Sequence, residues 1–174
     1  MAEEKKNPLG PTGEQVRANV ERVRESRGMT KKQLADRVSE LGRPIPPLGI
    51  SRIEAGTRRV DADDLVALAV ALRVSPSTLL LPSGPADRPA HVTAAGTVTT
   101  VEAWLWADGI RPLKLSDQDP SGDVQRYQLD ARPAWARNDP WKFGEVGHGE
   151  RDERTGLYEW YERVPMPTES NDQG

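Results

Sequence analysis

Cationic side chains gather around one short segment of the chain, and their chemistry is that of an anion-binding surface. Arg52 lies within the run from Ile50 to Gly56, and Arg58 and Arg59 follow that run. An arginine guanidinium is a rigid fork of donors that can bind two phosphate oxygens, or O6 and N7 of guanine, at once. An isolated basic pair is more often an ordinary solvated surface, so the elements that hold these cations decide the interpretation.

Two helical patterns precede this segment. Val16, Val20 and Val23 recur at helical spacing after Thr12-Gly13, and Arg27-Gly28 ends the row. The next pattern begins after Thr30, which can cap it, and Gly42 ends it. Its predicted buried face consists of Leu34, Ala35, Val38 and Leu41.

Three further helices are predicted after Gly42. Pro46-Pro47 fits the start of a third helix, because a proline at the first helical position loses only an N–H that had no partner, and Ala55-Gly56 ends this helix. Asp61 can cap a fourth helix, whose first turn carries two more carboxylates that suit the helix dipole. A short fifth helix runs from Ser75-Pro76 to Leu79-Leu80. The sequence therefore predicts a mainly α region of five helices.

The order of these residues resembles a known family. Arg24, Gly28-Met29-Thr30, Leu34-Ala35 and the run from Ile50 to Gly56 resemble the Cro/C1-type helix-turn-helix regulators, also called the XRE family, over roughly residues 13–82. The resemblance implies a five-helix DNA-binding domain in which the second helix crosses the DNA backbone and the third enters the major groove. It also implies that Arg24 pairs with Glu54 and that Ala35 lets the second and third helices approach each other.

The resemblance assigns base-reading roles to the third helix. Arg52 is the predicted main reader, because arginine can pair bidentately with guanine. Leu48 offers only apolar contact, for instance to a thymine methyl group, and Pro47 has no donor. Arg52 could instead pair with Glu54 or Asp36. The predicted base-reading set is Arg52, Leu48, Pro47 and Ser51.

A second set of residues is predicted to contact phosphates. Lys31 holds a position at which the family often has glutamine, and lysine can serve there as a point charge. Arg58 and Arg59 resemble clamps that follow the third helix. Arg43 lies on a turn, residues 39–45, that is longer than the usual turn of this family. The predicted phosphate-contacting set is Lys31, Lys32, Gln33, Arg43, Arg58 and Arg59.

Charge and composition divide the chain. Up to residue 83 it has 14 Lys and Arg against 11 Asp and Glu, and from residue 84 onward it has 10 against 16. The slightly acidic total does not oppose DNA binding, because the charge on one face is what matters. We predict a flexible arm at 1–12, a helix-turn-helix domain at 13–83, a linker at 84–90, a small irregular aromatic-rich module at 91–164 and a disordered tail at 165–174.

The C-terminal module is defined by its aromatic residues. It holds all five tryptophans of the chain, and burial of such rings stabilises even a small core. Thr99-x-x-Glu102 resembles a capping box that opens a short helix through Trp106. Residues 124–129 are predicted as a brief strand, and residues 157–164 as a strand or a short helix.

Three functions compete for this module: a second DNA contact, a dimerisation or partner-binding surface, and a small-ligand site. Its excess of acidic residues weakens the first, its short length weakens the third, and aromatic residues in a small domain are most often simply core. The first would use cations interleaved with tryptophans, namely Arg126, Arg132, Trp135, Arg137, Trp141 and Lys142.

Catalytic and metal-binding chemistry finds little support in the sequence. Cysteine is absent, and His91 and His148 belong to no metal-ligand spacing. No P-loop, GxSxG or GxGxxG pattern occurs. No apolar run is long enough to cross a membrane, and the charged start of the chain lacks a signal-peptide core. We therefore expect a cytoplasmic protein that is not an enzyme and needs no metal or cofactor.

The function predicted from the sequence is sequence-specific binding of double-stranded DNA by a transcriptional regulator. The expected mode is repression, in which residues 46–54 occupy the major groove near a promoter and exclude polymerase. The alternatives are a phage immunity repressor whose C-terminal module adds DNA contacts, and an antitoxin or partner-binding protein with autoregulatory DNA binding. The abundance of Arg, Ala, Val and Pro suggests an actinobacterial or actinophage source. A homodimer is possible, although no heptad repeat supplies an interface.

Overall fold

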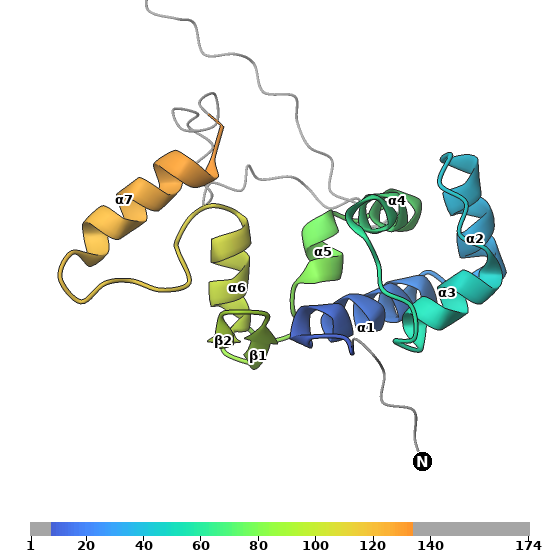
Figure 1. Cartoon of the computed structure of the whole chain (residues 1–174), viewed down its shortest axis with the longest axis horizontal. Coiled ribbons are helices and arrows are strands. Elements are labelled where there is room, and N and C mark those ends of the chain that lie inside the picture. Colours follow the sequence, from blue (N-terminus) through green and yellow to red (C-terminus); the bar gives the residue numbers. More distant parts are fainter. Residues whose placement is uncertain (1–7, 134–174) are drawn as a thin grey trace, which may run out of the picture. The chain divides into compact units, whose positions relative to one another are not determined.

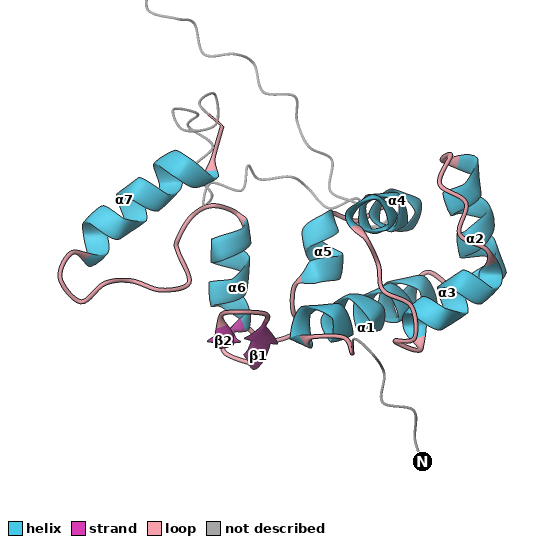
Figure 2. Ribbon diagram, in the orientation of Figure 1, coloured by secondary structure: helices cyan, strands magenta, loops and turns pink. Residues whose placement is uncertain are grey.

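The computed structural model describes residues 8–133, which form helices and one small sheet. The described residues up to Arg132 belong to one compact unit. Figures 1 and 2 show the elements in chain order. They are α1 (Pro11–Ser26), α2 (Lys31–Glu40), α3 (Pro47–Glu54), α4 (Ala62–Leu72), α5 (Pro76–Leu80), β1 (Pro89–Val92), β2 (Gly96–Thr99), α6 (Thr100–Ala107) and α7 (Pro120–Ala131). The mainly α class predicted from the sequence is confirmed.

The first five helices enclose a single apolar core. α1 packs against α3, α4 and α5, and α2 packs against α3 and α4 (Figure 1). Each helix contributes the face that its apolar spacing predicts, and the fully buried side chains include Val20, Leu34, Ile50, Leu68 and Leu79, one from each helix. Because the core uses one face of each helix, the outer face of α3 is left to solvent.

The predicted helix starts and stops are confirmed for α2 to α5. Thr30 accepts from the N–H of Gln33, whose side chain accepts in return from the N–H of Thr30, so both orphan donors are satisfied. Asp61 and Ser75 cap α4 and α5 without this reciprocity, since their side-chain oxygens accept from the N–H groups of Asp64 and Thr78. Pro47 occupies the first position of α3, and Gly56 follows that helix with a φ of 68° that favours glycine.

Two predictions in this region are wrong in detail. α1 begins at Pro11, so Pro11 and Thr12 belong to the helix and not to the N-terminal arm. Proline is well placed at a first helical position, and Thr12 is held by Thr93, since each hydroxyl accepts from the other residue's N–H at 3.3 and 3.1 Å. Leu41 is 50% exposed, because α2 ends at Glu40 and Leu41 only caps it. Residues 1–7 lie outside the described range.

A short hairpin that the sequence did not predict follows α5. β1 and β2 pair antiparallel, with Ala90 opposite Val98. Pro89 and Ala90 were expected in a linker, and the backbone before them is also tied down, because Thr100 N donates to the Arg88 carbonyl at 2.9 Å. The strands are four residues each, too short for a clear alternating pattern. Residues 84–90 are therefore joined to the hairpin and to α6.

The predicted capping box at Thr99 and Glu102 is confirmed, and it opens α6. The predicted strand at residues 124–129 is wrong, because those residues lie inside α7. Asp119 caps α7 and Pro120 takes its first position, so the start signal was present but was outweighed by the β-like composition of the following run. The expected strand or helix at 157–164 and the tail at 165–174 lie outside the described residues, as do Trp135, Arg137, Trp141 and Lys142.

The elements after α5 are fastened to the helical core by side-chain hydrogen bonds. The indole Nε1–H of Trp104 donates to the Pro82 carbonyl at 3.0 Å. Within the C-terminal part, the Tyr127 hydroxyl donates to the Trp106 carbonyl, and Gln128 donates to the Ile110 carbonyl. Across residues 8–133, no helix combines the length and the apolar character that a membrane span requires.

Candidate nucleic-acid interface

α3 presents a free face that combines one cation with apolar residues. Ile50 and Ile53 are buried in the core, whereas Pro47, Leu48 and Arg52 are exposed, and Leu48 is 61% exposed. Leu48 and Arg52 are one helical turn apart, so they lie on the same outer face. Ser51, the fourth predicted base reader, is half-buried.

Arg52 is the cation of this face. Within residues 8–133, its guanidinium makes no hydrogen bond or ion pair, although its backbone carbonyl accepts from the N–H groups of Thr57 and Arg58. The predicted alternative pairings do not form, because Glu54 is occupied by other cations and Asp36 pairs with Lys32. The Arg52 guanidinium is therefore available to an external acceptor.

Glu54, at the end of α3, is buried and bound by two cations. Arg24 Nε lies 2.6 Å from Oε1 and Arg24 Nη2 lies 3.1 Å from Oε2, which is the paired geometry expected from the resemblance. The side chains are 8% and 2% exposed. The hydrogen bond to Glu54 raises the pKa of Arg24 above its ordinary value. Arg24 also donates to the Met29 carbonyl, so it holds α1, α3 and the turn before α2 together.

The three residues predicted to contact phosphates at the start of α2 already have partners within the protein. Lys31 Nζ lies 3.1 Å from Glu54 Oε2 and its side chain is 41% exposed. Lys32 is 76% exposed and pairs with Asp36 on the same helix. The side-chain oxygen of Gln33 is used in the capping box, accepting from Thr30 N at 2.8 Å. Two ammonium groups thus remain at the surface next to α3.

Arg43 and Arg58 both bind Asp64, one of the two carboxylates in the first turn of α4 for which the sequence predicts only a helix-dipole role. Arg43 Nε lies 2.9 Å from Asp64 Oδ1, and Arg58 Nη2 lies 2.6 Å from Asp64 Oδ2. Arg43 also pairs with Asp61 at 2.8 Å. The hydrogen bond to Asp64 is the main cause of a raised pKa at Arg43. Asp64 is buried, and sequence spacing gave no signal of this role, because both partners come from irregular loops.

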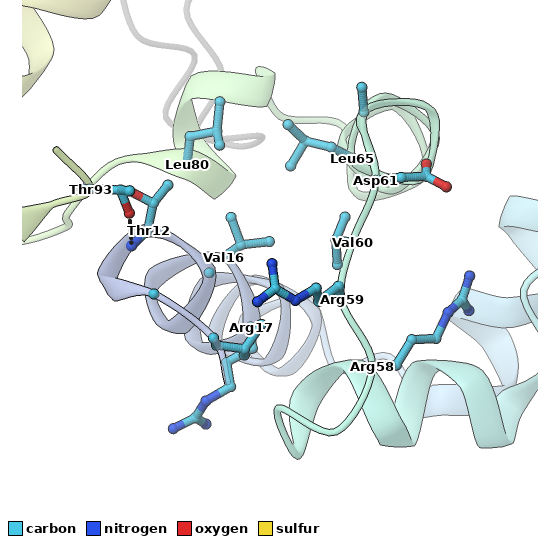
Figure 3. A pocket seen from close by; sticks show the side chains of 14 residues that line it. Thr12, Val16, Arg17, Arg58, Arg59, Val60, Asp61, Leu65, Leu80 and Thr93 are labelled. Atoms are coloured by element: carbon cyan, nitrogen blue, oxygen red, sulfur yellow. Dashed lines mark hydrogen bonds between the residues drawn. The ribbon is translucent and has the colours of Figure 1, made fainter. Parts of the chain in front are cut away.

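Arg59 serves a different region from Arg58, although the two are adjacent. Its Nη2 donates to the Pro8 carbonyl at 2.6 Å. Figure 3 shows Arg59 beside an open pocket of about 390 Å³, whose apolar wall includes Val16, Val60 and Leu65, while Arg58 is turned away. Arg59 therefore fastens the segment before α1, and the expected pair of clamps is divided between two sites.

Comparison with known proteins gives a family match for the helical region that contains this face. Residues 20–79 match the family model described as Helix-turn-helix. The matched residues run from the middle of α1 to α5, and they contain α2, α3 and the loops that carry Arg43 and Arg58. No curated protein and no solved structure matches the chain. This part of the chain is a helix-turn-helix domain of the kind that binds DNA.

Proposed function

We propose that the protein is a sequence-specific transcriptional regulator that represses by occupying its operator. The observation that carries this proposal is the outer face of α3, where Arg52 is exposed and unpaired within the described residues and Leu48 lies one turn away. A helix with such a face, in a domain of this family, is suited to the major groove. A protein bound in this way at a promoter, in the cytoplasm or nucleoid, would exclude polymerase.

The base-reading chemistry of this face is simple. Arg52 would pair with O6 and N7 of a guanine, and Leu48 would contact a thymine methyl group. Pro46 and Pro47 are exposed and offer DNA only apolar contact, because proline has no N–H donor. The half-buried Ser51 supplies one hydroxyl. We expect the operator half-site to contain one strongly required G·C pair next to an A·T pair.

The phosphate contacts would come from cations that already have partners in the free protein. Lys31 and Lys32 lie at the N-terminus of α2, where the helix dipole also favours an anion. Arg43 and Arg58 are partly exposed and flank α3. Because each of the four is paired with a carboxylate, a phosphate must share or replace that partner, so the gain for each contact is smaller than for a free cation.

A partner-binding role is the second candidate, and exposed apolar side chains favour it. Val101, Trp106 and Leu129 on α6 and α7 are 42%, 37% and 54% exposed. Exposed apolar side chains of this kind suit a homodimer contact or a toxin-like partner, with DNA binding used for autoregulation. A phage immunity repressor remains a third form of the same proposal, in which the C-terminal part adds contacts to DNA.

Selection from a random duplex library by the full chain tests the proposal. Enrichment of one motif, followed by a protected footprint over that motif at a promoter, is the expected result. Recovery of duplexes without a shared motif would contradict sequence-specific binding. Mass measurement of the complex then distinguishes one copy from two, and the arrangement of half-sites should follow the symmetry of the protein.

A further inference from the structure

The carboxylate of Asp64 lies at the point where both loops that flank α3 meet α4. Asp64 is in the first turn of α4, its backbone N–H donates to Asp61 Oδ1 at 2.7 Å, and its side chain is 2% exposed. The cap fixes the backbone position of this carboxylate. A buried carboxylate with such a fixed backbone is a firm anchor for cations that approach it.

Each oxygen of this carboxylate binds an arginine from a different side of α3. Arg43 precedes α3 and reaches Oδ1 at 2.9 Å, and Arg58 follows α3 and reaches Oδ2 at 2.6 Å. One side chain of α4 therefore holds both ends of the segment that contains the recognition helix. Residues 43–46 and 57–60 contain no helix or strand, so the two ion pairs to Asp64 act beside the burial of Ile45 and the backbone hydrogen bond from Arg58 to Arg52.

Arg58 also contacts the recognition helix directly. A Cβ added at Gly49 would lie 2.9 Å from Arg58 Nη1 and 2.9 Å from Ile45 Cγ2. The guanidinium thus lies against the first turn of α3, in space that only a glycine leaves open. The chain that leaves α3 is held in this position because Arg58 N donates to the Arg52 carbonyl at 3.0 Å.

We infer that Asp64 is a positioning residue that fixes the orientation of α3 on the helical core through Arg43 and Arg58, and thereby sets sequence selectivity. This inference rests on the proposed function. Base readout requires Arg52 to meet a base edge within hydrogen-bond distance, so a small rotation of α3 removes the contact. Phosphate contacts by flexible cations tolerate such a rotation. Loss of Asp64 should therefore reduce selectivity more than general affinity for DNA.

The test compares Asp64→Asn with Asp63→Asn in the full chain. Both changes remove one negative charge from the same helical turn. Asp63 is the control because its side chain is 84% exposed and its carboxylate lies 3.8 Å from Arg43 Nη1, too far for a hydrogen bond. The measured quantity is the ratio of dissociation constants for a scrambled duplex and for the duplex that the wild type selects from a random library. Asp64→Asn should lower this ratio about tenfold, and Asp63→Asn should leave it within about twofold.

Amide hydrogen exchange of the free protein gives a readout that does not depend on DNA. In Asp64→Asn, the amides of α3 should exchange faster relative to those of α1 and α5, whereas a general loss of stability would accelerate all of them. If the wild type selects no sequence, the proposed function fails, and the exchange pattern still decides whether Asp64 positions α3. An unchanged ratio together with unchanged α3 exchange would overturn the inference.

Arg43→Gln removes the ion pair between Arg43 and Asp64 by changing its more exposed member. This variant replaces Asp64→Asn in the test if Asp64→Asn does not fold. Its loss of a phosphate contact should weaken binding to both duplexes, and its effect on positioning should appear as a further fall in the ratio. An equal weakening for both duplexes with α3 exchange unchanged would contradict the positioning role.

Discussion

Glu54 and Asp64 are the two buried carboxylates among the described residues, and each binds two cations. Both lie beside α3. Three of the basic residues predicted to contact DNA are partners of these two acids in the free protein, namely Lys31, Arg43 and Arg58. Arg52 differs from them, because its guanidinium has no partner within residues 8–133. Arg52 can therefore read a base, whereas the paired cations stabilise the fold in the free protein.

Glu54→Ala should destabilise the domain strongly, because it removes the buried carboxylate of Arg24 and leaves that guanidinium only the exposed carboxylate of Glu25, at 3.2 Å. Removal of one member of a buried pair costs about 3–5 kcal/mol, which is a large part of the stability of a small domain. The measurement is chemical denaturation of Glu54→Ala, Arg24→Ala and the double variant. The double variant should lose less than the two single losses combined, since no lone charge remains. Additive losses would show that the two side chains do not interact.

At the scale of elements, the sequence predicted the helices well because their signals are local. Thr30, Asp61 and Pro47 mark the starts of three helices through side-chain caps and a fixed φ, and these starts were predicted correctly. The hairpin at Pro89–Thr99 was missed because its strands are short and gain their stability from contacts with α1 and α6. The strand predicted at residues 124–129 was wrong, because the cap at Asp119 and the proline that follows it start a helix despite the β-like composition of those six residues.

The candidate site was predictable only in part, for a physical reason. Arg52 and Leu48 lie on a regular helix, so the spacing of Ile50 and Ile53 already indicates which face they share. Arg43, Arg58 and Asp64 meet through irregular loops, and no periodicity reports such contacts. Arg58 and Arg59 are adjacent in the sequence, yet Arg58 binds Asp64 and Arg59 binds the Pro8 carbonyl. Adjacency in the sequence does not predict this difference.

The start of α7 should depend on pH through Asp123. Hydrogen bonds from the Ser116 backbone N–H and from Arg126 lower the pKa of this carboxyl from 3.8 to about 2. Because the folded pKa lies below the ordinary value, the stabilisation is present above pH 3.8 and is lost as the pH falls through about 2. Carboxyl carbon shifts in an NMR titration should show that midpoint, and the Ser116 amide should titrate with it. In Asp123→Asn the Ser116 amide should lose this step, and a midpoint near 3.8 in the wild type would refute the contact.

At the scale of the whole molecule, the helical core of α1 to α5 is complete without the elements that follow it. Its buried apolar residues from Val16 to Leu79 form one cluster that includes no side chain from α6 or α7. The later elements are attached at the edge, through Thr93 to Thr12 and through Trp104 to Pro82. The hairpin and α6 thus add contacts at the edge of the helical core.

A fragment of residues 1–83 should therefore fold cooperatively. It keeps the whole apolar cluster and loses only the edge contacts, so its melting temperature should be somewhat lower than that of residues 1–132. Circular dichroism during heating measures both. A coil spectrum for the shorter fragment, beside a folded spectrum for the longer one, would mean that the hairpin and α6 are required for the core.

Arg52 is the residue through which α3 is proposed to read DNA sequence, and one comparison of binding profiles tests this role. Wild type, Arg52→Ala and Lys32→Ala are each presented with the same random duplex library. Arg52→Ala should lose about 1–3 kcal/mol of specific binding and relax the preference at a single G·C position. Lys32→Ala should weaken binding to all sequences and reduce the salt dependence by about one contact or less. Identical sequence preferences for Arg52→Ala and the wild type would show that Arg52 reads no base.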